Sequence, residues 1–317
     1  MLKAFVFLNL FILGQVFGTP VKEQVLSWKG STFSVNDSWL YLSSNESERL
    51  EILLDLLSQS TFGRELIKKS EQRARELGDQ KDLVKFLRQG ETSITDTTLN
   101  RQFSPSDPND VSYSTHSLVY IDEGLSLGDA ILDLAHELTH FAIRKPSNPY
   151  SEFFDLDYYV ESTILGEGGE SEAFLSECQV MRELFKTRFN RDKNCLYLNT
   201  AEQGSLTQRS LARKLFFQIG KYLSKFHDKL QKFELPKNHF PHTVSDEPAF
   251  VSSNYDMPYP MAAVEEYEQI MKKVCANDQR RLTYLEKSYR KNGNRQPASE
   301  GFIAEQKKLL RRCKHFL

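Results

Sequence analysis

The chain has 317 residues, among them 22 Phe and 13 Tyr, and its formal net charge is -2. Acidic and basic residues are mixed along it without a basic block, so we expect no nucleic-acid partner and no anionic-membrane surface. Beyond its first residues, no stretch reaches the roughly 20 apolar residues of a membrane helix. The composition is typical of a packed globular protein without a membrane anchor in its mature form, and it does not indicate the oligomeric state.

The first 18 residues have the layout of a secretory signal peptide. Lys3 precedes an apolar run from Ala4 to Leu13, and Gly18 ends a short segment that fits a cleavage site. We therefore expect export to the periplasm or the extracellular space. Residues 19–317 are then long enough for one large domain with a substantial core.

The mature chain contains four cysteines, which are Cys178, Cys195, Cys275 and Cys313. An even number in an exported protein predicts two disulfides, with three pairings open. A zinc site made of these cysteines is disfavoured because none belongs to a C-x-x-C pair.

The first part of the mature chain, residues 19–90, is predicted to be largely helical. Asn45 precedes an apolar run that ends at Leu57, which indicates a capped helix, and a second helix is expected from Thr61 until Gly78 stops it. The segment 90–115 is polar and contains two prolines, so it is expected to form a long surface loop.

The clearest strand is predicted at residues 116–122, which are short, apolar and β-branched. A helix follows at residues 130–143, with apolar side chains on nearly every side, as in buried helices. Glycines then lead into a helix that begins at Glu170. Further helices are expected at 205–231, 261–291 and 299–313, with a loop at 235–260. The sequence therefore predicts an α+β fold that is mostly α.

The buried helix carries the sequence HELTH at residues 136–140. His136 and His140 are four residues apart, so both imidazoles leave one face of the helix within reach of one metal ion. Burying both rings and the Glu137 carboxylate among leucines would cost several kcal/mol unless a metal compensated for it. Two neutral His nitrogens with a third protein ligand make an open zinc site, and Glu137 is placed to act as general base on a water.

The strand, the short turn and the HELTH helix resemble the zincin metallopeptidases over roughly residues 112–185. The resemblance implies one Zn²⁺ per chain and a small sheet whose edge strand lies next to the HExxH helix. In the gluzincin branch the third ligand is a Glu in an E-x-x-A setting, and Glu170 with Ala173 looks like that. Phe174 stands where some gluzincins have an Asp, and the metzincin extension of the motif is absent.

Other residues are candidates for supporting roles at such a site. Glu172 is the alternative third ligand, but it projects about 200° away from Glu170 around a helix, so both cannot bind the metal. Asp133 and Glu177 are expected to hydrogen bond to a ligating His. Zincins also stabilise the oxyanion, and the candidates in the 235–260 loop are His239, His242, Tyr255 and Tyr259.

The leading hypothesis is an exported zinc-dependent metallopeptidase that hydrolyses peptide or protein substrates with Glu137 as general base. An extended substrate is expected to pair with the strand at Leu118–Ile121. Two alternatives use the same sequence features. One is a catalytically inactive zincin-fold binding protein, and the other is a zinc amidase that acts on a cell-wall-type amide.

Overall fold

The computed structural model describes residues 24–78, 82–104, 106–202, 204–244, 247–291 and 300–316. The expected signal peptide, residues 1–18, lies outside the described residues. The described chain is α+β and mostly helical with small sheets, so the predicted class is confirmed. No described helix combines the length and the apolar character that crossing a membrane requires.

The N-terminal part contains the two predicted helices together with strands that the prediction missed. Asn45 caps α1 by accepting a hydrogen bond from the Glu48 backbone N–H at 3.1 Å, and Gly78 follows the end of α2. A hairpin precedes them and a short strand follows. In chain order the elements are β1 (Val25–Trp28), β2 (Ser31–Ser34), η1 (Trp39–Leu42), α1 (Glu46–Leu57), α2 (Thr61–Leu77), η2 (Leu83–Phe86) and β3 (Leu87–Gly90).

The predicted surface loop at residues 90–115 is wrong. Most of that segment forms a long hairpin of β4 (Ile94–Phe103) and β5 (Val111–Asp122), paired in antiparallel register from Ile94↔Tyr120 to Phe103↔Val111. The segment is polar because much of β4 faces solvent, yet it is rich in threonine, whose branched Cβ favours extended backbone. Polarity was therefore a poor guide, since an exposed hairpin is also polar.

The predicted strand at residues 116–122 exists as the end of β5, but it is not an edge strand. β5 lies in the middle of a three-stranded sheet, parallel to β3 on one side and antiparallel to β4 on the other. Its backbone hydrogen-bonding groups at Leu118–Ile121 are therefore used within the sheet. The two edges of the sheet are β3 and β4, and β4 also contacts the helix that carries the HELTH sequence, α3 (Leu127–Ile143).

Two hydrophobic cores lie on either side of α5 (Glu170–Leu184). The first packs α3 against α1, α2 and the sheet, and the second is built mainly around α4 (Leu156–Leu165) and α10 (Tyr259–Lys291). Phe174 on α5 packs against both cores. The remaining elements are α6 (Lys186–Phe189), α7 (Lys193–Leu198), α8 (Leu206–Phe216), η3 (Gly220–Tyr222), α9 (Leu223–Lys232), β6 (Val251–Ser252), β7 (Met257–Pro258) and α11 (Glu300–Arg312).

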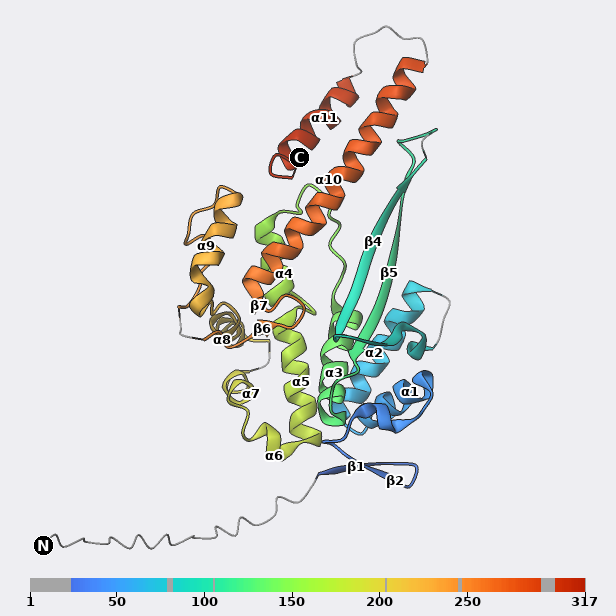
Figure 1. The fold of residues 1–317 in the computed structure, drawn as a ribbon, viewed down its shortest axis with the longest axis vertical. Helices are drawn as coiled ribbons and strands as arrows, with labels where there is room; N and C mark the ends of the chain where they lie inside the picture. Colours follow the sequence, from blue (N-terminus) through green and yellow to red (C-terminus); the bar gives the residue numbers. More distant parts are fainter. Residues whose placement is uncertain are drawn as a thin grey trace, which may run out of the picture.

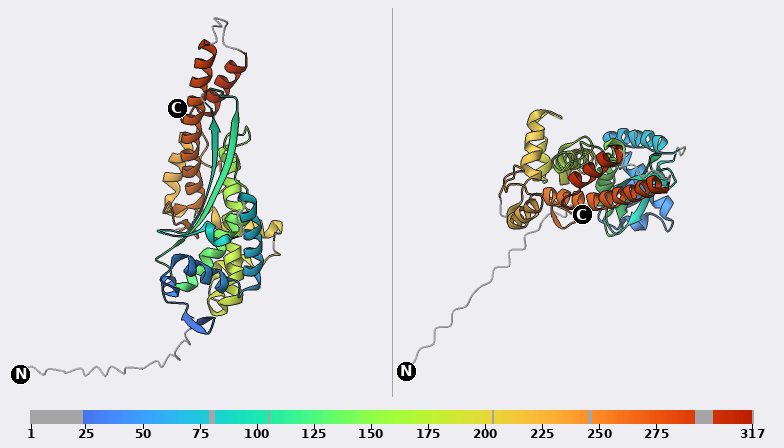
Figure 2. Two further views of the ribbon diagram at one scale, coloured as in Figure 1. Left: turned by 90° about the vertical axis from the view of Figure 1, so that its right-hand side faces the viewer. Right: turned by 90° about the horizontal axis from the view of Figure 1, so that it is seen from above.

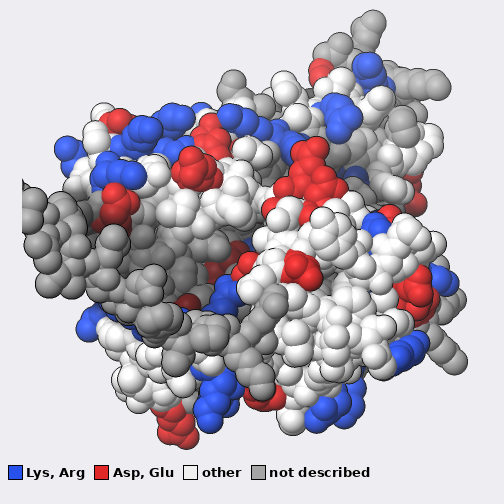
Figure 3. Space-filling view, turned by 60° about the horizontal axis from the view of Figure 1, so that its bottom comes forward, with Lys and Arg blue, Asp and Glu red and all other residues white. Residues whose placement is uncertain are grey.

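The C-terminal helices match their predicted positions with one break. The helix expected at 205–231 is divided into α8 and α9, because the backbone of Phe217 and Ile219 hydrogen bonds to Thr243 and Gly220 has a φ of +53°. α10 and α11 agree with the expected ranges within two residues. In both Figure 1 and Figure 2, the β4–β5 hairpin runs beside α10 away from the helical body. On the face drawn in Figure 3, basic and acidic side chains are interspersed.

Both predicted disulfides are present in the described chain, and the structure supplies their pairing. Cys178 on α5 bonds to Cys195 on α7, and Cys275 on α10 bonds to Cys313 just after α11. The second bridge closes a loop with a sequence separation of 38 residues. It therefore fixes α11 against α10, in the second core.

We expect the double variant Cys275→Ala/Cys313→Ala to lose about 2–4 kcal/mol of unfolding free energy, because the cross-link restricts the unfolded chain. Urea denaturation of the variant and of the oxidised wild type measures the difference. Wild-type protein under reducing conditions is the control for the bond itself. Equal midpoints and slopes for variant and wild type would contradict the expectation.

Candidate metal centre

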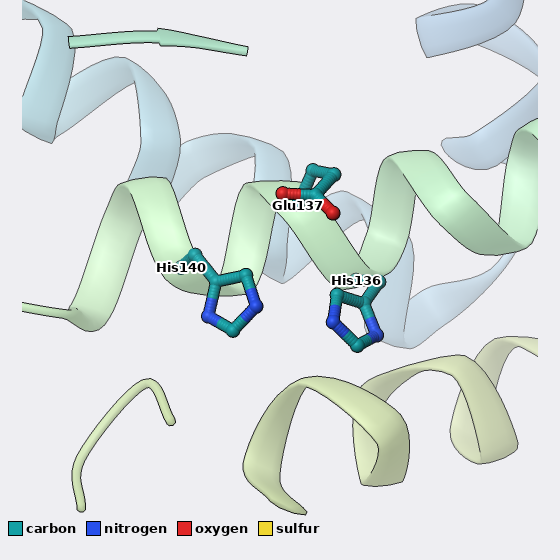
Figure 4. A group of neighbouring side chains, drawn as sticks. All are labelled: His136, Glu137 and His140. Atoms are coloured by element: carbon teal, nitrogen blue, oxygen red, sulfur yellow. The ribbon is translucent and has the colours of Figure 1, made fainter. Parts of the chain in front are cut away.

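The site is built on α3, whose start is fixed by a cap and whose middle is buried. Ser126 accepts a hydrogen bond from the Asp129 backbone N–H at 3.2 Å, which satisfies one of the free donors of the first turn. Further along, Glu137 and His140 are only 6% and 7% exposed. Figure 4 shows the imidazoles of His136 and His140 leaving α3 side by side. One ligand atom from each of these three residues lies within 4.8 Å of the others, so the group could hold a metal ion.

Each imidazole is oriented through its Nδ1 atom. His140 Nδ1 donates to the backbone carbonyl of Gly168 at 2.7 Å, and His136 Nδ1 contacts the Glu177 carboxylate. In a neutral imidazole, an Nδ1–H group held in this way leaves Nε2 as the lone-pair nitrogen, which is the form that binds a metal. The two Nε2 atoms are therefore the available donors of the pair.

Glu170 is the carboxylate that both Nε2 atoms face. Its oxygens lie 3.3 Å from Nε2 of His136 and 3.6 Å from Nε2 of His140. The residue begins α5, directly after a turn of glycines. Glu172 faces another way, since its Oε2 accepts a hydrogen bond from the Gly168 backbone N–H at 2.7 Å. Of the two alternative ligands, the structure brings only Glu170 to the histidines.

The other two predicted supporting acids also lie at the site. Glu177, two turns after Glu170 on α5, contacts His136, while Asp133, one turn before His136 on α3, lines the same cavity. Burial raises the pKa of Asp133 to about 6, against a hydrogen bond to Ser93 that lowers it. The predicted hydrogen bond to a histidine is therefore present for Glu177, whereas Asp133 bonds to Ser93 instead.

The cavity above α3 has a volume of about 360 Å³ and is lined by an excess of acids. Five acids, which are Asp133, Glu137, Glu170, Glu177 and Glu266, line it together with two histidines and Arg144. Burial alone lowers the pKa of His136, but its hydrogen bonds to Glu170 and Glu177 hold that pKa well above its usual value. Five carboxylates around one cavity favour a cation, and the nitrogen and oxygen donors are those that zinc accepts. These residues therefore fit a divalent metal ion.

The strand β4 reaches the site through Thr95. The Thr95 hydroxyl oxygen lies 2.8 Å from the backbone oxygen of Glu137 and 2.8 Å from its Oε2. This contact anchors the Glu137 side chain to the sheet. The sequence analysis missed Thr95 because this residue lies in the segment predicted to be a loop. The available signal was the group of β-branched residues Ile94, Thr95, Thr97 and Thr98.

Only some of the candidate oxyanion residues lie at the site. Tyr255 and Tyr259 line the cavity. Burial and the neighbouring Glu170 carboxylate hold the pKa of Tyr259 well above its usual value, so its hydroxyl stays protonated. His239 instead pairs with Asp157, and His242 donates from Nδ1 to the Phe240 carbonyl at 2.9 Å. Neither histidine lines the cavity.

Gly168 is a second residue that the sequence analysis did not assign to the site. Its φ is +63°, and an added Cβ would lie 2.4 Å from the Arg144 backbone nitrogen. Its carbonyl also accepts the hydrogen bond from His140. A larger residue therefore cannot enter without moving the peptide that orients a metal-facing ring.

We expect Gly168→Ala to cost more than about 1 kcal/mol of unfolding free energy from backbone strain alone, and to weaken metal binding as well. Gly204→Ala is a matched control, because Gly204 also has a positive φ, of +74°, but nothing lies within 4 Å of its added Cβ. Urea denaturation and zinc titration of both variants separate strain from the contact with Arg144. Equal zinc affinities in the two variants would show that Gly168 does not orient His140.

Comparison with protein-family models, with curated proteins and with solved structures returned no match to this chain.

Proposed function

We propose that this protein is an exported zinc metallopeptidase of zincin type, with a gluzincin-like ligand set. His136, His140 and Glu170 would hold the metal. The main support for this proposal is that the Nε2 atoms of both histidines face the Glu170 carboxylate. Glu137 is better suited to catalysis than to ligation, because its Oε2 is held by Thr95 on β4. A zinc ion bound here would acidify a coordinated water and polarise a substrate carbonyl.

Glu137 acts as the proton carrier in this proposal. It takes a proton from the attacking water, whose oxygen bonds to the peptide carbonyl carbon. The C–N bond then breaks, and Glu137 delivers the proton to the departing amine. Water is the only co-reactant, so the products are a new carboxylate and a new amine.

Tyr259 supplies a hydrogen bond to the oxygen that gains negative charge when water adds to the carbonyl. Its side chain lines the cavity and its hydroxyl lies beside Glu170, next to the residues that would hold the metal. A donor already placed where charge develops stabilises the transition state more than the substrate. Tyr255 lines the same cavity from the loop between β6 and β7.

The substrate chain pairs with β4. This strand is the longer of the two edge strands of the sheet, with 10 residues against 4 in β3, and Thr95 connects it directly to Glu137. An extended peptide on that edge brings its carbonyl groups over α3. Export is supported by the two disulfides, which persist in oxidising compartments.

The test is metal content together with hydrolysis. We expect purified residues 19–317 to contain one equivalent of zinc by elemental analysis and to cleave a mixture of unstructured peptides. A chelator should abolish cleavage, and added zinc should restore it. Zinc-loaded protein that cleaves no peptide but hydrolyses a cell-wall-type amide would instead support the amidase alternative. Protein that binds no zinc after reconstitution would overturn the proposal.

A further inference from the structure

A second cavity continues from the metal centre between β4 and α10. It has a volume of about 290 Å³. Five lining residues are common to it and to the metal cavity, which are Ile94, Thr95, His140, Arg144 and Glu266. The two cavities therefore adjoin at His140, and anything bound in the second lies next to the proposed reaction centre.

The two long walls of this second cavity start at the metal centre and run outward together. The β4 wall extends from Ile94 to Leu99, and the α10 wall extends from Glu266 to Val274. Figure 1 shows β4 and α10 rising in the same direction. At 3.4 Å per strand residue and 1.5 Å per helix residue, both walls are about 12–17 Å long. That length accommodates about four residues of an extended peptide.

Apolar side chains line much of this cavity. Phe154 and Tyr159 pack together with ring centroids 5.4 Å apart, and Ile270 and Val274 lie along α10. Ile270 is one helical turn beyond Glu266, or about 6 Å further from the metal centre. An extended peptide covers that distance in about two residues.

The direction of β4 determines which half of a substrate this cavity can hold. Antiparallel pairing is the commoner arrangement, and a chain antiparallel to β4 enters at Leu99 and arrives at Ile94. Its residues in the second cavity then precede the scissile bond. Because the cavity has room for several of them, a substrate with a single residue before the scissile bond would leave most of it empty.

We propose that the cavity between β4 and α10 binds three or four substrate residues on the amino-terminal side of the scissile bond, which makes the protein an endopeptidase. An apolar side chain about two residues before that bond packs against Ile270. This inference rests on the proposed function and adds its substrate class, which is an unstructured polypeptide cut at an internal bond.

Peptides of graded length test the inference. One scissile bond is placed after one, two, four or six residues, with Leu or Ser two residues before the bond in the longer peptides. We expect kcat/KM to rise by about 100-fold or more between one and four residues and then to level off, and Leu to be preferred by about 10-fold or more. Equal kcat/KM for all lengths would overturn the inference and leave the peptidase proposal standing.

A variant that fills the cavity gives a second measurement. Ile270→Trp is expected to lower kcat/KM about 10-fold or more for the six-residue Leu peptide, and less than twofold for the one-residue peptide. Gln269→Trp is the matched control, since Gln269 is exposed on the same helix and does not line either cavity. If Ile270→Trp and Gln269→Trp changed kcat/KM by the same factor, substrate binding in this cavity would be contradicted.

Binding separates failure of the cavity from failure of the chemistry. Zinc-loaded Glu137→Gln is titrated with fluorescent peptides of the same lengths, and affinity is read from anisotropy. Affinity that rises with length and is lost in Glu137→Gln/Ile270→Trp supports the cavity even if the wild type cleaves nothing, in which case only the peptidase proposal fails. Affinity that is independent of length and of Ile270 overturns the inference.

Discussion

Replacement of Glu137 by Gln is expected to lower kcat for peptide hydrolysis by a factor of about 10²–10⁴. The amide has nearly the same shape as the carboxylate and can still contact Thr95, but it cannot accept a proton from water. Zinc content and peptide affinity should stay close to those of the wild type. The effect should therefore fall on kcat and leave the metal site intact.

Steady-state kinetics on a peptide with four residues before the scissile bond measure this effect, alongside elemental analysis of the same preparation. Glu172→Gln is the matched control. It makes the same chemical change two residues after Glu170, at a side chain that caps the Gly168 N–H and does not line the metal cavity. Wild-type kcat in Glu137→Gln would show that another group carries the proton.

Three Glu→Gln variants on α5 are expected to bind zinc with graded affinity. Loss of an outer carboxylate costs about 10–100-fold in metal affinity, which we expect for Glu177→Gln because it contacts His136. Glu170→Gln should cost more than that, because it removes the charged oxygen that both Nε2 atoms face. Glu172→Gln should bind zinc as the wild type does.

Competition with a chromophoric chelator gives the zinc dissociation constants of the three variants. Thermal unfolding with and without zinc ranks the same affinities independently. Bound metal stabilises the folded state by RT ln(1 + [L]/Kd), so the weakest binder should gain the least. The same affinity for Glu170→Gln and Glu172→Gln would remove Glu170 from the ligand set. Glu137 would then be the remaining carboxylate of the group that could hold a metal.

Local sequence patterns predicted the parts of the site that lie on one helix. The spacing of His136 and His140 follows from 3.6 residues per turn, and the apolar residues around them indicated burial. α5 was also visible, because glycines and acids mark its start. The position of Glu170 opposite both histidines was implied only by the resemblance to gluzincins, since no local pattern encodes a contact across 30 residues of sequence.

The features of the site and fold that the sequence did not predict depend on tertiary contacts. Thr95 reaches Glu137 because β4 forms a hairpin, and a polar, solvent-facing strand has almost the composition of a loop. Gly168 matters through the direction of its carbonyl, which sequence does not reveal. Disulfide pairing is likewise set by which helices pack together. Whether strand 116–122 is an edge depended on β3 and β4, neither of which was predicted.

In the proposed enzyme, metal binding and substrate recognition depend on different hydrophobic cores. The metal-facing side chains stand on α3 and the start of α5, whereas Tyr259, Glu266 and Ile270 stand on α10, which belongs to the second core. In the proposed enzyme, substitutions at Ile270, which does not line the metal cavity, would therefore change which sequences are cut without disturbing metal affinity. In relatives of this chain, we expect the residues of the first core to vary little. Differences in substrate preference should arise from residues of the second core.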